Sequence, residues 1–180
     1  MVNVRGWWEM IPSPAPQPAR RVMNHGKEQM ATCKKCLVIG VASMALAIGC
    51  GAFGAHALKS ILQEGVKAGE LTEHESLDTS RGWDVAVRNH GIHSLGLVFL
   101  GLATSFCSPG LFRWGRALLL VGIVLFCGLI YIYTAVKVTS GTPLTVLMFL
   151  VPLGGGSWIL GWILLAVGFY RGPAVNSKLD

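Results

Sequence analysis

Four ionisable side chains lie within or beside long apolar stretches, where such groups are costly and often functional. His56 ends one stretch, and Arg88, His90 and His93 open the next. If the two stretches are antiparallel helices, all four residues fall at one membrane level. His56 paired with His90 or His93 across a cavity is the arrangement that ligates haem through two imidazoles. The CxxCH motif for covalent haem attachment is missing from the sequence.

Two other interpretations of these residues remain. A proton or quinone site is one, but proton relays commonly use carboxylates, and no Asp or Glu lies within an apolar stretch. The interpretation we favour is structural. It has His56, Asn89 and His93 forming hydrogen bonds across the helix pair, each contributing roughly 0.6–2 kcal/mol. Arg88 then extends to the acidic loop or to lipid headgroups. The sequence therefore predicts a structural polar cluster that consists of His56, Arg88, Asn89 and His93, and it predicts no catalytic residue.

Cys33 and Cys36 form a single CxxC motif where the first apolar stretch begins. A structural zinc site needs a second ligand pair, and only His25 lies on that side. The other cysteines fall within apolar stretches, where they behave as small hydrophobic residues: Cys50, Cys107 and Cys127. We therefore expect neither a metal site nor a disulfide framework.

The elements that must position these side chains are four apolar stretches. Each approaches or exceeds the roughly 20 residues that a helix needs to cross a bilayer. They run over about 36–58, 85–107, 117–136 and 144–170. Composition agrees, since 52% of the residues are hydrophobic and 13% are charged, against about 25% charged in soluble domains. The sequence predicts an all-α membrane protein, a four-transmembrane-helix bundle in one domain over residues 36–170.

Residues 1–35 differ from the rest and form a basic extension, and residues 171–180 form a short tail. Prolines at 12, 14, 16 and 18 predict an extended, polyproline-like segment. Such a segment orders by lying along a partner. Between the first two spans, Thr72 followed by Glu75 is a capping-box pattern and predicts a short surface helix.

Basic residues are distributed unevenly across the predicted topology. Ten lie before the first span, between the second and third, or after the fourth, and five lie on the opposite side. The positive-inside rule puts both termini on the matrix or cytoplasmic side. This distribution argues for lipid headgroups rather than nucleic acid as the partner. The residues expected to contact headgroups are Arg20, Arg21, Lys34, Lys35, Arg113 and Arg116.

Glycine and proline mark two places in the spans. Gly51 and Gly54 permit close helix contact near the end of the first span. Pro152, Gly154 and Gly155 predict a kink or a short broken segment in the fourth. Broken helices can line transport sites, but there is no second, inverted break and no intramembrane carboxylate. We therefore expect a packing role.

Four motifs resemble one known family. The first reads Gly51-Ala52-Phe53-Gly54-Ala55-His56, followed by Leu58-Lys59. The others, in order, are Trp83 with Ala86 and His93, then Leu125-Phe126-Cys127-Gly128-Leu129-Ile130-Tyr131, then Pro152-Leu153-Gly154-Gly155 with Gly161-Trp162. Together they resemble the domain-of-unknown-function 423 family, small bacterial inner-membrane proteins with eukaryotic relatives in the transmembrane protein 256 group. The resemblance covers about residues 36–168 and implies a four-helix membrane protein with no established reaction.

These observations lead to one leading expectation about function. We expect a non-catalytic accessory subunit of a mitochondrial inner-membrane respiratory-chain complex, with other membrane subunits and phospholipids such as cardiolipin as partners. No cofactor and no nucleic acid are expected. The alternative is a free-standing small membrane protein that binds or transports a small molecule near His56 and His93. An enzyme is the weakest of the three readings.

Overall fold

The computed structural model describes residues 19–141 and 145–173, with side chains for 34–141 and 146–173, and every regular element in these ranges is helical. One continuous rod consists of α1 (Ala19–Phe53), the π-helical η2 (Gly54–Leu58) and α2 (Lys59–Lys67). The second rod is α3 (Glu73–Ala103), ending in the 3-10 turn η3 (Thr104–Phe106). The third comprises α4 (Pro109–Gly122), the π-helical η4 (Ile123–Gly128) and α5 (Leu129–Ser140). Short α6 (Thr145–Met148) precedes α7 (Val151–Arg171).

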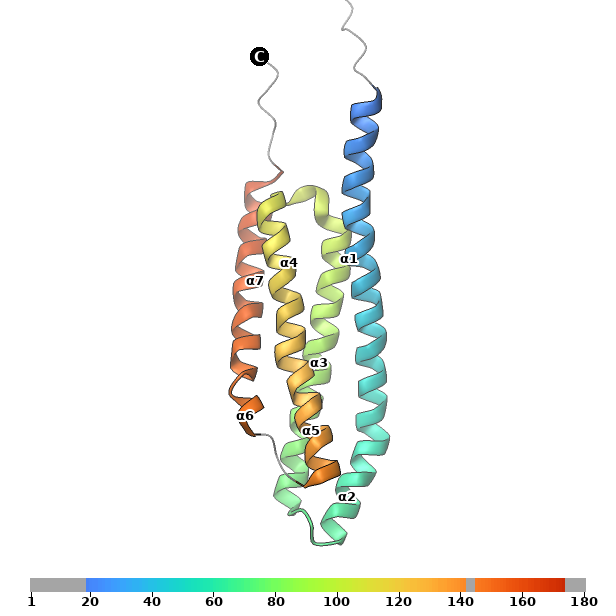
Figure 1. Ribbon diagram of the computed structural model, residues 1–180, viewed down its shortest axis with the longest axis vertical. Helices are drawn as coiled ribbons and strands as arrows, with labels where there is room; N and C mark the ends of the chain where they lie inside the picture. The colour runs from blue at the N-terminus through green and yellow to red at the C-terminus, as the bar shows by residue number, and fades with distance from the viewer. Residues whose placement is uncertain (1–18, 142–144, 174–180) are drawn as a thin grey trace, which may run out of the picture.

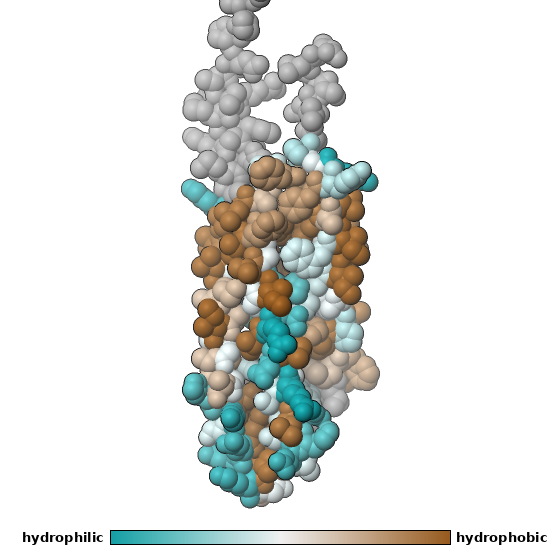
Figure 2. Space-filling model, turned by 180° about the vertical axis from the view of Figure 1, so that it is seen from behind, coloured by the Kyte–Doolittle hydropathy of each residue, from teal (hydrophilic) through white to brown (hydrophobic). Residues whose placement is uncertain are grey.

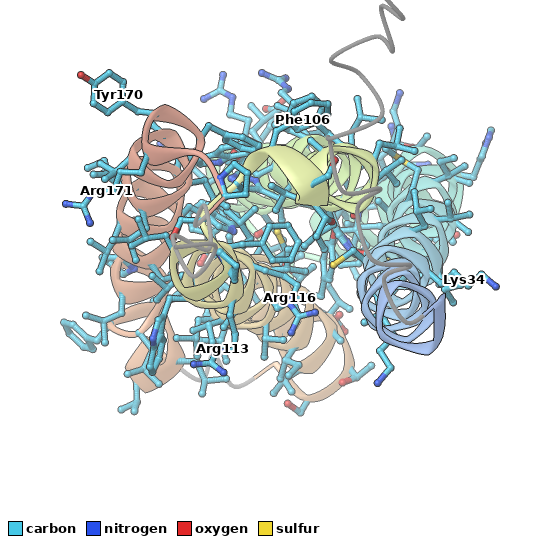
Figure 3. All side chains as sticks on the ribbon, turned by 90° about the horizontal axis from the view of Figure 1, so that it is seen from above. Lys34, Phe106, Arg113, Arg116, Tyr170 and Arg171 are labelled. Carbon is cyan, nitrogen blue, oxygen red and sulfur yellow. The ribbon has the colours of Figure 1, made fainter. Side chains whose placement is uncertain are left out.

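The rods lie side by side as an antiparallel bundle (Figure 1). α3 packs chiefly on α1, α7 packs chiefly on α4, and η4 contacts both α3 and α7. The start of α4 and the end of α7 lie at one end (Figure 1). We call it the basic end, because Lys34, Arg113 and Arg171 are seen there from above (Figure 3). The α2–α3 connection lies at the other end, which we call the loop end (Figure 1).

Three helical segments are long and apolar enough to cross a membrane: Lys34–Lys67, Pro109–Ser140 and Val146–Arg171. The span predicted over 85–107 does not qualify, because the polar residues 88–90 and His93 lower its hydropathy. The expected four-helix arrangement is thus matched by four long rods in the described part of the chain, three of which are apolar enough by composition alone to span a membrane. Large apolar side chains point outward around the bundle, including Val38 at 68% exposed and Ile159 at 66%. An apolar exterior of this kind suits lipid rather than water.

The second half of the N-terminal extension, residues 19–35, is helical and forms the beginning of α1. Helix α1 begins at Ala19, directly after the last proline of the Pro-rich run. The residues that follow include Ala, Arg, Met, Lys, Glu and Gln, which favour helix. The Pro-rich segment itself, residues 11–18, lies outside the described residues.

Pro152 opens a helix and does not kink one. It lies in the first turn of α7, after the break that separates α7 from α6. Proline suits this position because a first-turn N–H has no partner within the helix. Of the two predicted outcomes, the structure has the broken segment.

Gly154 and Gly51 lie at close helix contacts, as their sequence context predicts. A Cβ on Gly154 would lie 2.6 Å from the backbone nitrogen of Phe126 in η4, and one on Gly51 would lie 3.3 Å from Val87. The contact at Gly155 is looser, because a Cβ there would lie 3.9 Å from the nearest atom of Phe126.

Replacing Gly154 should separate α7 from η4. The Gly154→Ala variant places its methyl group against backbone that cannot rotate aside, so we expect a loss of about 1–3 kcal/mol in unfolding free energy. The matched control is Gly156→Ala, where no atom lies within 4 Å and alanine favours the helix by about 1 kcal/mol. Denaturation in detergent measures both. Equal stability of the two variants would contradict the close contact.

The predicted capping box is present at the start of α3. Thr72 is the N-cap, its hydroxyl accepts from the Glu75 N–H at 3.2 Å, and its own N–H donates to the Glu75 carboxylate at 2.9 Å. The prediction of a short surface helix is wrong, because the helix that begins here continues to Ala103. No Pro or tight turn interrupts the segment between the loop and the second apolar stretch.

Acid should weaken this cap. The hydrogen bond from the Thr72 backbone N–H, and then that from its hydroxyl, lowers the pKa of the Glu75 carboxyl. A lowered pKa in the folded state means that the stabilisation is complete above the ordinary carboxyl pKa and is lost as the pH falls through the lowered value. We expect the melting temperature of the wild type to fall across that window more than that of Glu75→Gln. Parallel pH profiles would contradict this role for Glu75.

Candidate functional site

Close approach of α1 and α3 positions the polar side chains of the bundle interior. A Cβ on Gly40 would lie 2.8 Å from the backbone nitrogen of Val98, and one on Gly101 would lie 3.0 Å from that of Leu37. Backbones brought together by small residues are the usual basis of helix association in membranes. About one turn farther toward the loop end, even the short side chain of Ser43 reaches across to α3.

A polar network connects three helices at this level. The Ser43 hydroxyl of α1 lies 3.0 Å from His90 Nε2 and 2.7 Å from the Ser94 hydroxyl, both on α3. His90 Nδ1 lies 3.3 Å from the Tyr131 hydroxyl on α5. His90 is 3% exposed and Ser94 0%. Both imidazole nitrogens therefore have partners, as buried polar groups require.

Trp83 closes the loop end of this network. Its Nε1 donates to the Cys50 carbonyl at 2.9 Å, and its ring centroid lies 4.6 Å from that of Tyr131. The indole packs directly over Gly54, where a Cβ would collide with it. The predicted packing role of Gly54 thus has a specific cause, the space that Trp83 occupies.

A second aromatic contact holds α7 against α3 and α4. The His93 and Trp158 rings are stacked with centroids 3.8 Å apart and planes 9° apart. Trp158 Nε1 donates to the Leu119 carbonyl at 3.1 Å, and its ring fills the space over Gly122. His93 Nδ1 lies 2.8 Å from the Asn89 carbonyl of its own helix.

The structure does not bring the predicted cluster together. His56 is exposed on η2, and no hydrogen bond of its side chain occurs among the described residues. Arg88 is exposed on the outer face of α3, and Asn89 donates to the Val85 carbonyl of its own helix at 2.9 Å. His93 faces inward toward Trp158. At this level of α3, the hydrogen bonds to other helices come instead from His90 and Ser94.

Sequence reasoning considered His90 only as a haem ligand and missed Ser43, Ser94 and Tyr131. Two signals were available. Ser43 is the only hydroxyl residue in the stretch 36–58, and Ser94 lies four residues after His90, on the same helix face. Nothing in the sequence identifies Tyr131 as their partner, because residues 90 and 131 belong to different helices.

The Ser43–His90 distance suits a nucleophile and its base, but the surroundings do not suit catalysis. Ser94 also binds the Ser43 hydroxyl. The nearby backbone lies in helices, whose N–H groups are already bonded and cannot stabilise an oxyanion. His56 lies outside and His90 inside, so they do not oppose each other across a cavity as haem requires. The arrangement is one that fixes helices in register.

Basic side chains gather at the basic end (Figure 3). Lys34, Lys35 and Arg113 are exposed, as expected of residues that meet lipid headgroups. Arg116 differs: it is half-buried, its Nη1 lies 3.7 Å from Cys36 Sγ, and its buried Nε has no partner in the described part. The side chains of Arg20 and Arg21, like those of Cys33 and His25, lie outside the described residues. Among the described residues, no group of three or more His, Cys, Asp or Glu side chains is placed to hold a metal ion.

A charged stripe follows the outer face of α3 toward the middle of the bundle. It consists of Asp78, Arg81, Asp84 and Arg88, all exposed. Figure 2 shows hydrophilic surface at the loop end and a hydrophilic stripe that rises between hydrophobic regions. Beyond Arg88 the same face turns apolar, at Ile92, Leu95 and Phe99.

The comparisons with known proteins agree with the fold. The profile of the family described as Protein of unknown function (DUF423) matches residues 50–155. The chain belongs to the DUF423 family. It is 31% identical to the UPF0382 membrane protein YwdK of Bacillus subtilis over 135 residues, 74% of this chain and 94% of that protein. It is 28% identical to a UPF0382 membrane protein of Staphylococcus haemolyticus over 138 residues, 77% of this chain and 97% of the relative. No solved structure matches the chain significantly.

This DUF423 protein is therefore an integral membrane protein whose bacterial relatives carry names that state no reaction. The relatives are matched almost over their whole length, and about a quarter of this chain lies beyond the match. Apolar helices and the names of the relatives agree on the membrane.

The polar network predicts a measurable coupling between α1 and α3. In a double-mutant cycle, Ser43→Ala and His90→Asn should be coupled by about 0.6–1.7 kcal/mol, the range found for hydrogen bonds between membrane helices. The control cycle pairs Ser43→Ala with His93→Asn, because the contacts of His93 are with Asn89 and Trp158. Unfolding in a detergent titration supplies the free energies. Equal coupling in both cycles would contradict the network.

Proposed function

We propose that this protein is a non-catalytic accessory subunit of a larger membrane complex, with all four long rods crossing the bilayer and both termini on the same side. The role is to cover a lateral surface of the complex, hold lipid and brace neighbouring subunits. This proposal rests mainly on the outer face of α3.

The deciding observation is the level at which Arg88 lies. Trp83 and Val87 contact α1 at Cys50 and Gly51, so Arg88 is level with that part of α1. Still nearer the loop end, α1 exposes Phe53 at 45%. The large outward side chains of α1 at and beyond this level, Ile48 and Phe53, are thus apolar.

The third rod also exposes apolar side chains at the level of the charged residues of α3. Cys127 Sγ donates to the Ala86 carbonyl at 3.2 Å, so η4 is level with the same part of α3. Nearer the loop end, Ile132 is 50% exposed. A charged stripe between two apolar surfaces is costly against lipid tails. A neighbouring membrane subunit with polar side chains at this level would satisfy it.

The finer proposal is that the host is a respiratory-chain complex of the mitochondrial inner membrane. Two features support it. The chain extends beyond its bacterial relatives, and its basic residues cluster at the basic end, where each contributes about 1 kcal/mol of attraction to anionic lipid such as cardiolipin. The alternative, a free-standing protein binding a small molecule near His56 and His93, has less support because His56 is exposed on η2 whereas His93 is buried against Trp158.

Native size tests the proposal. After mild digitonin extraction, we expect the wild type to co-migrate on a native gel with a large complex, whose identity mass spectrometry of the slice establishes. The Arg88→Glu variant should be released from that complex, because the charge at the contact is reversed. The control Lys35→Glu makes the same change at the basic end and should remain bound. A wild type that migrates as a monomer or small homo-oligomer would overturn the proposal.

A further inference from the structure

A crevice of about 750 Å³ separates η2 and α2 from the first half of α3. α2 runs away from the middle of the bundle and α3 runs toward it, so the crevice has a membrane-facing end and an outer end. Lys59 and Asp84 line the membrane-facing end, and Lys67 and Glu73 line the outer end. Each end therefore carries one charge of each sign.

The two charged side chains at the membrane-facing end do not form an ion pair with each other. Lys59 and Asp84 line the same crevice, yet neither has an ion-pair partner within 4 Å in the described part of the chain. An ammonium and a carboxylate facing one space without contact can bind a group that carries both signs. Such a pair has no net charge, so it does not favour a ligand that is only anionic.

The residues that line the crevice also restrict which positively charged group a ligand could place there. No Phe, Tyr or Trp lines the crevice, and its neutral polar residues are Gln63, Ser76 and Ser80. Proteins recognise trimethylammonium groups with aromatic cages. A primary ammonium, in contrast, donates hydrogen bonds to carboxylate and hydroxyl oxygens. The crevice therefore suits a primary ammonium better than a choline group.

The position of the crevice points to a lipid as the source of this group. Its membrane-facing end includes Gly54 and Ala55, directly after the outward apolar residue Phe53 and before the first charge at Lys59. Apolar side chains continue along its wall at Leu62 and Leu77. A phospholipid in the adjacent leaflet could place its headgroup here without leaving the bilayer.

We propose that the membrane-facing end of this crevice binds the headgroup of phosphatidylethanolamine. The Lys59 ammonium binds the phosphate, and the Asp84 carboxylate accepts hydrogen bonds from the ethanolamine ammonium. This inference deepens the lipid-holding part of the proposed function and places a lipid at the loop end, opposite the basic residues. Lys67 and Glu73 do not take part, because Lys67 lies about 12 Å farther along α2 at 1.5 Å per residue.

The wild-type headgroup preference is the primary test. The full chain is purified in detergent and mixed with equal amounts of phosphatidylethanolamine, phosphatidylcholine and phosphatidylglycerol of one acyl composition. Native mass spectrometry then counts the bound lipids. We expect phosphatidylethanolamine to bind about tenfold more tightly than the others, as loss of a charge-assisted hydrogen bond implies. Equal binding of the three lipids would overturn the proposal.

Two variants locate the site. Asp84→Asn should reduce the preference over phosphatidylcholine, and Lys59→Gln should weaken phosphatidylethanolamine binding. The matched controls Glu73→Gln and Lys67→Gln make the same charge changes at the outer end of the crevice and should leave both unchanged. Equal effects of variants and controls would contradict the assignment. Soluble phosphoethanolamine shares the headgroup but lacks acyl chains. If it displaced the bound phospholipid at equal concentration, the occupant of the crevice would not be a lipid.

The two proposals fail separately. If the chain migrates as a monomer but prefers phosphatidylethanolamine, the subunit role is wrong and the lipid site stands. If the chain co-migrates with a complex but binds the three lipids equally, only the lipid site is wrong.

Discussion

Backbone contact at glycine is what the rest of the bundle depends on. Inside a bilayer the lipid is as apolar as the helix surface, so burial of apolar side chains does little to hold helices together. Close packing must do it instead. On the α4–α7 side, Gly115 and Gly161 face each other so closely that a Cβ on either would lie 3.1–3.2 Å from the carbonyl oxygen of the other. Gly40 and Gly101 play the same part between α1 and α3.

The interior polar groups follow from that contact. Ser43 has a short side chain, and it bonds His90 and Ser94 because α1 and α3 lie nearly in backbone contact. The tryptophans use the same device, since Trp83 and Trp158 each lie over a glycine of a neighbouring rod. The polar atoms of this network are paired with one another across the helices. The groups left for recognition lie on the outer face of α3 and at the ends of the bundle.

The two ends present different chemistry. The basic end combines cations with exposed aromatic residues, Trp114 at 62% and Tyr170 at 92%, an arrangement typical of a membrane interface. The loop end is mixed in charge and contains crevices on both sides of α3. Lys137, for example, donates to Thr79 at 3.0 Å and fixes the end of α5 to α3. The proposed contacts with anionic lipid fall at the first end, and the proposed phosphatidylethanolamine site falls at the second.

The sequence by itself determined the features that depend on neighbours along the chain. Apolar length predicted the helical rods, Thr72 and Glu75 predicted where α3 begins, and ordered motifs indicated the family. It did not predict that α1 begins at Ala19, and the span that it predicted over 85–107 is helical but less apolar than the other three. Only the tertiary structure decided which histidine is buried. His56 lies on η2 near the loop end and is exposed, whereas His90 lies near the middle of α3, where helix packing turns it toward Ser43 and Tyr131. The two partners of His90 lie 47 and 41 residues away in the sequence, a pairing that no local period encodes because it depends on how separate helices pack.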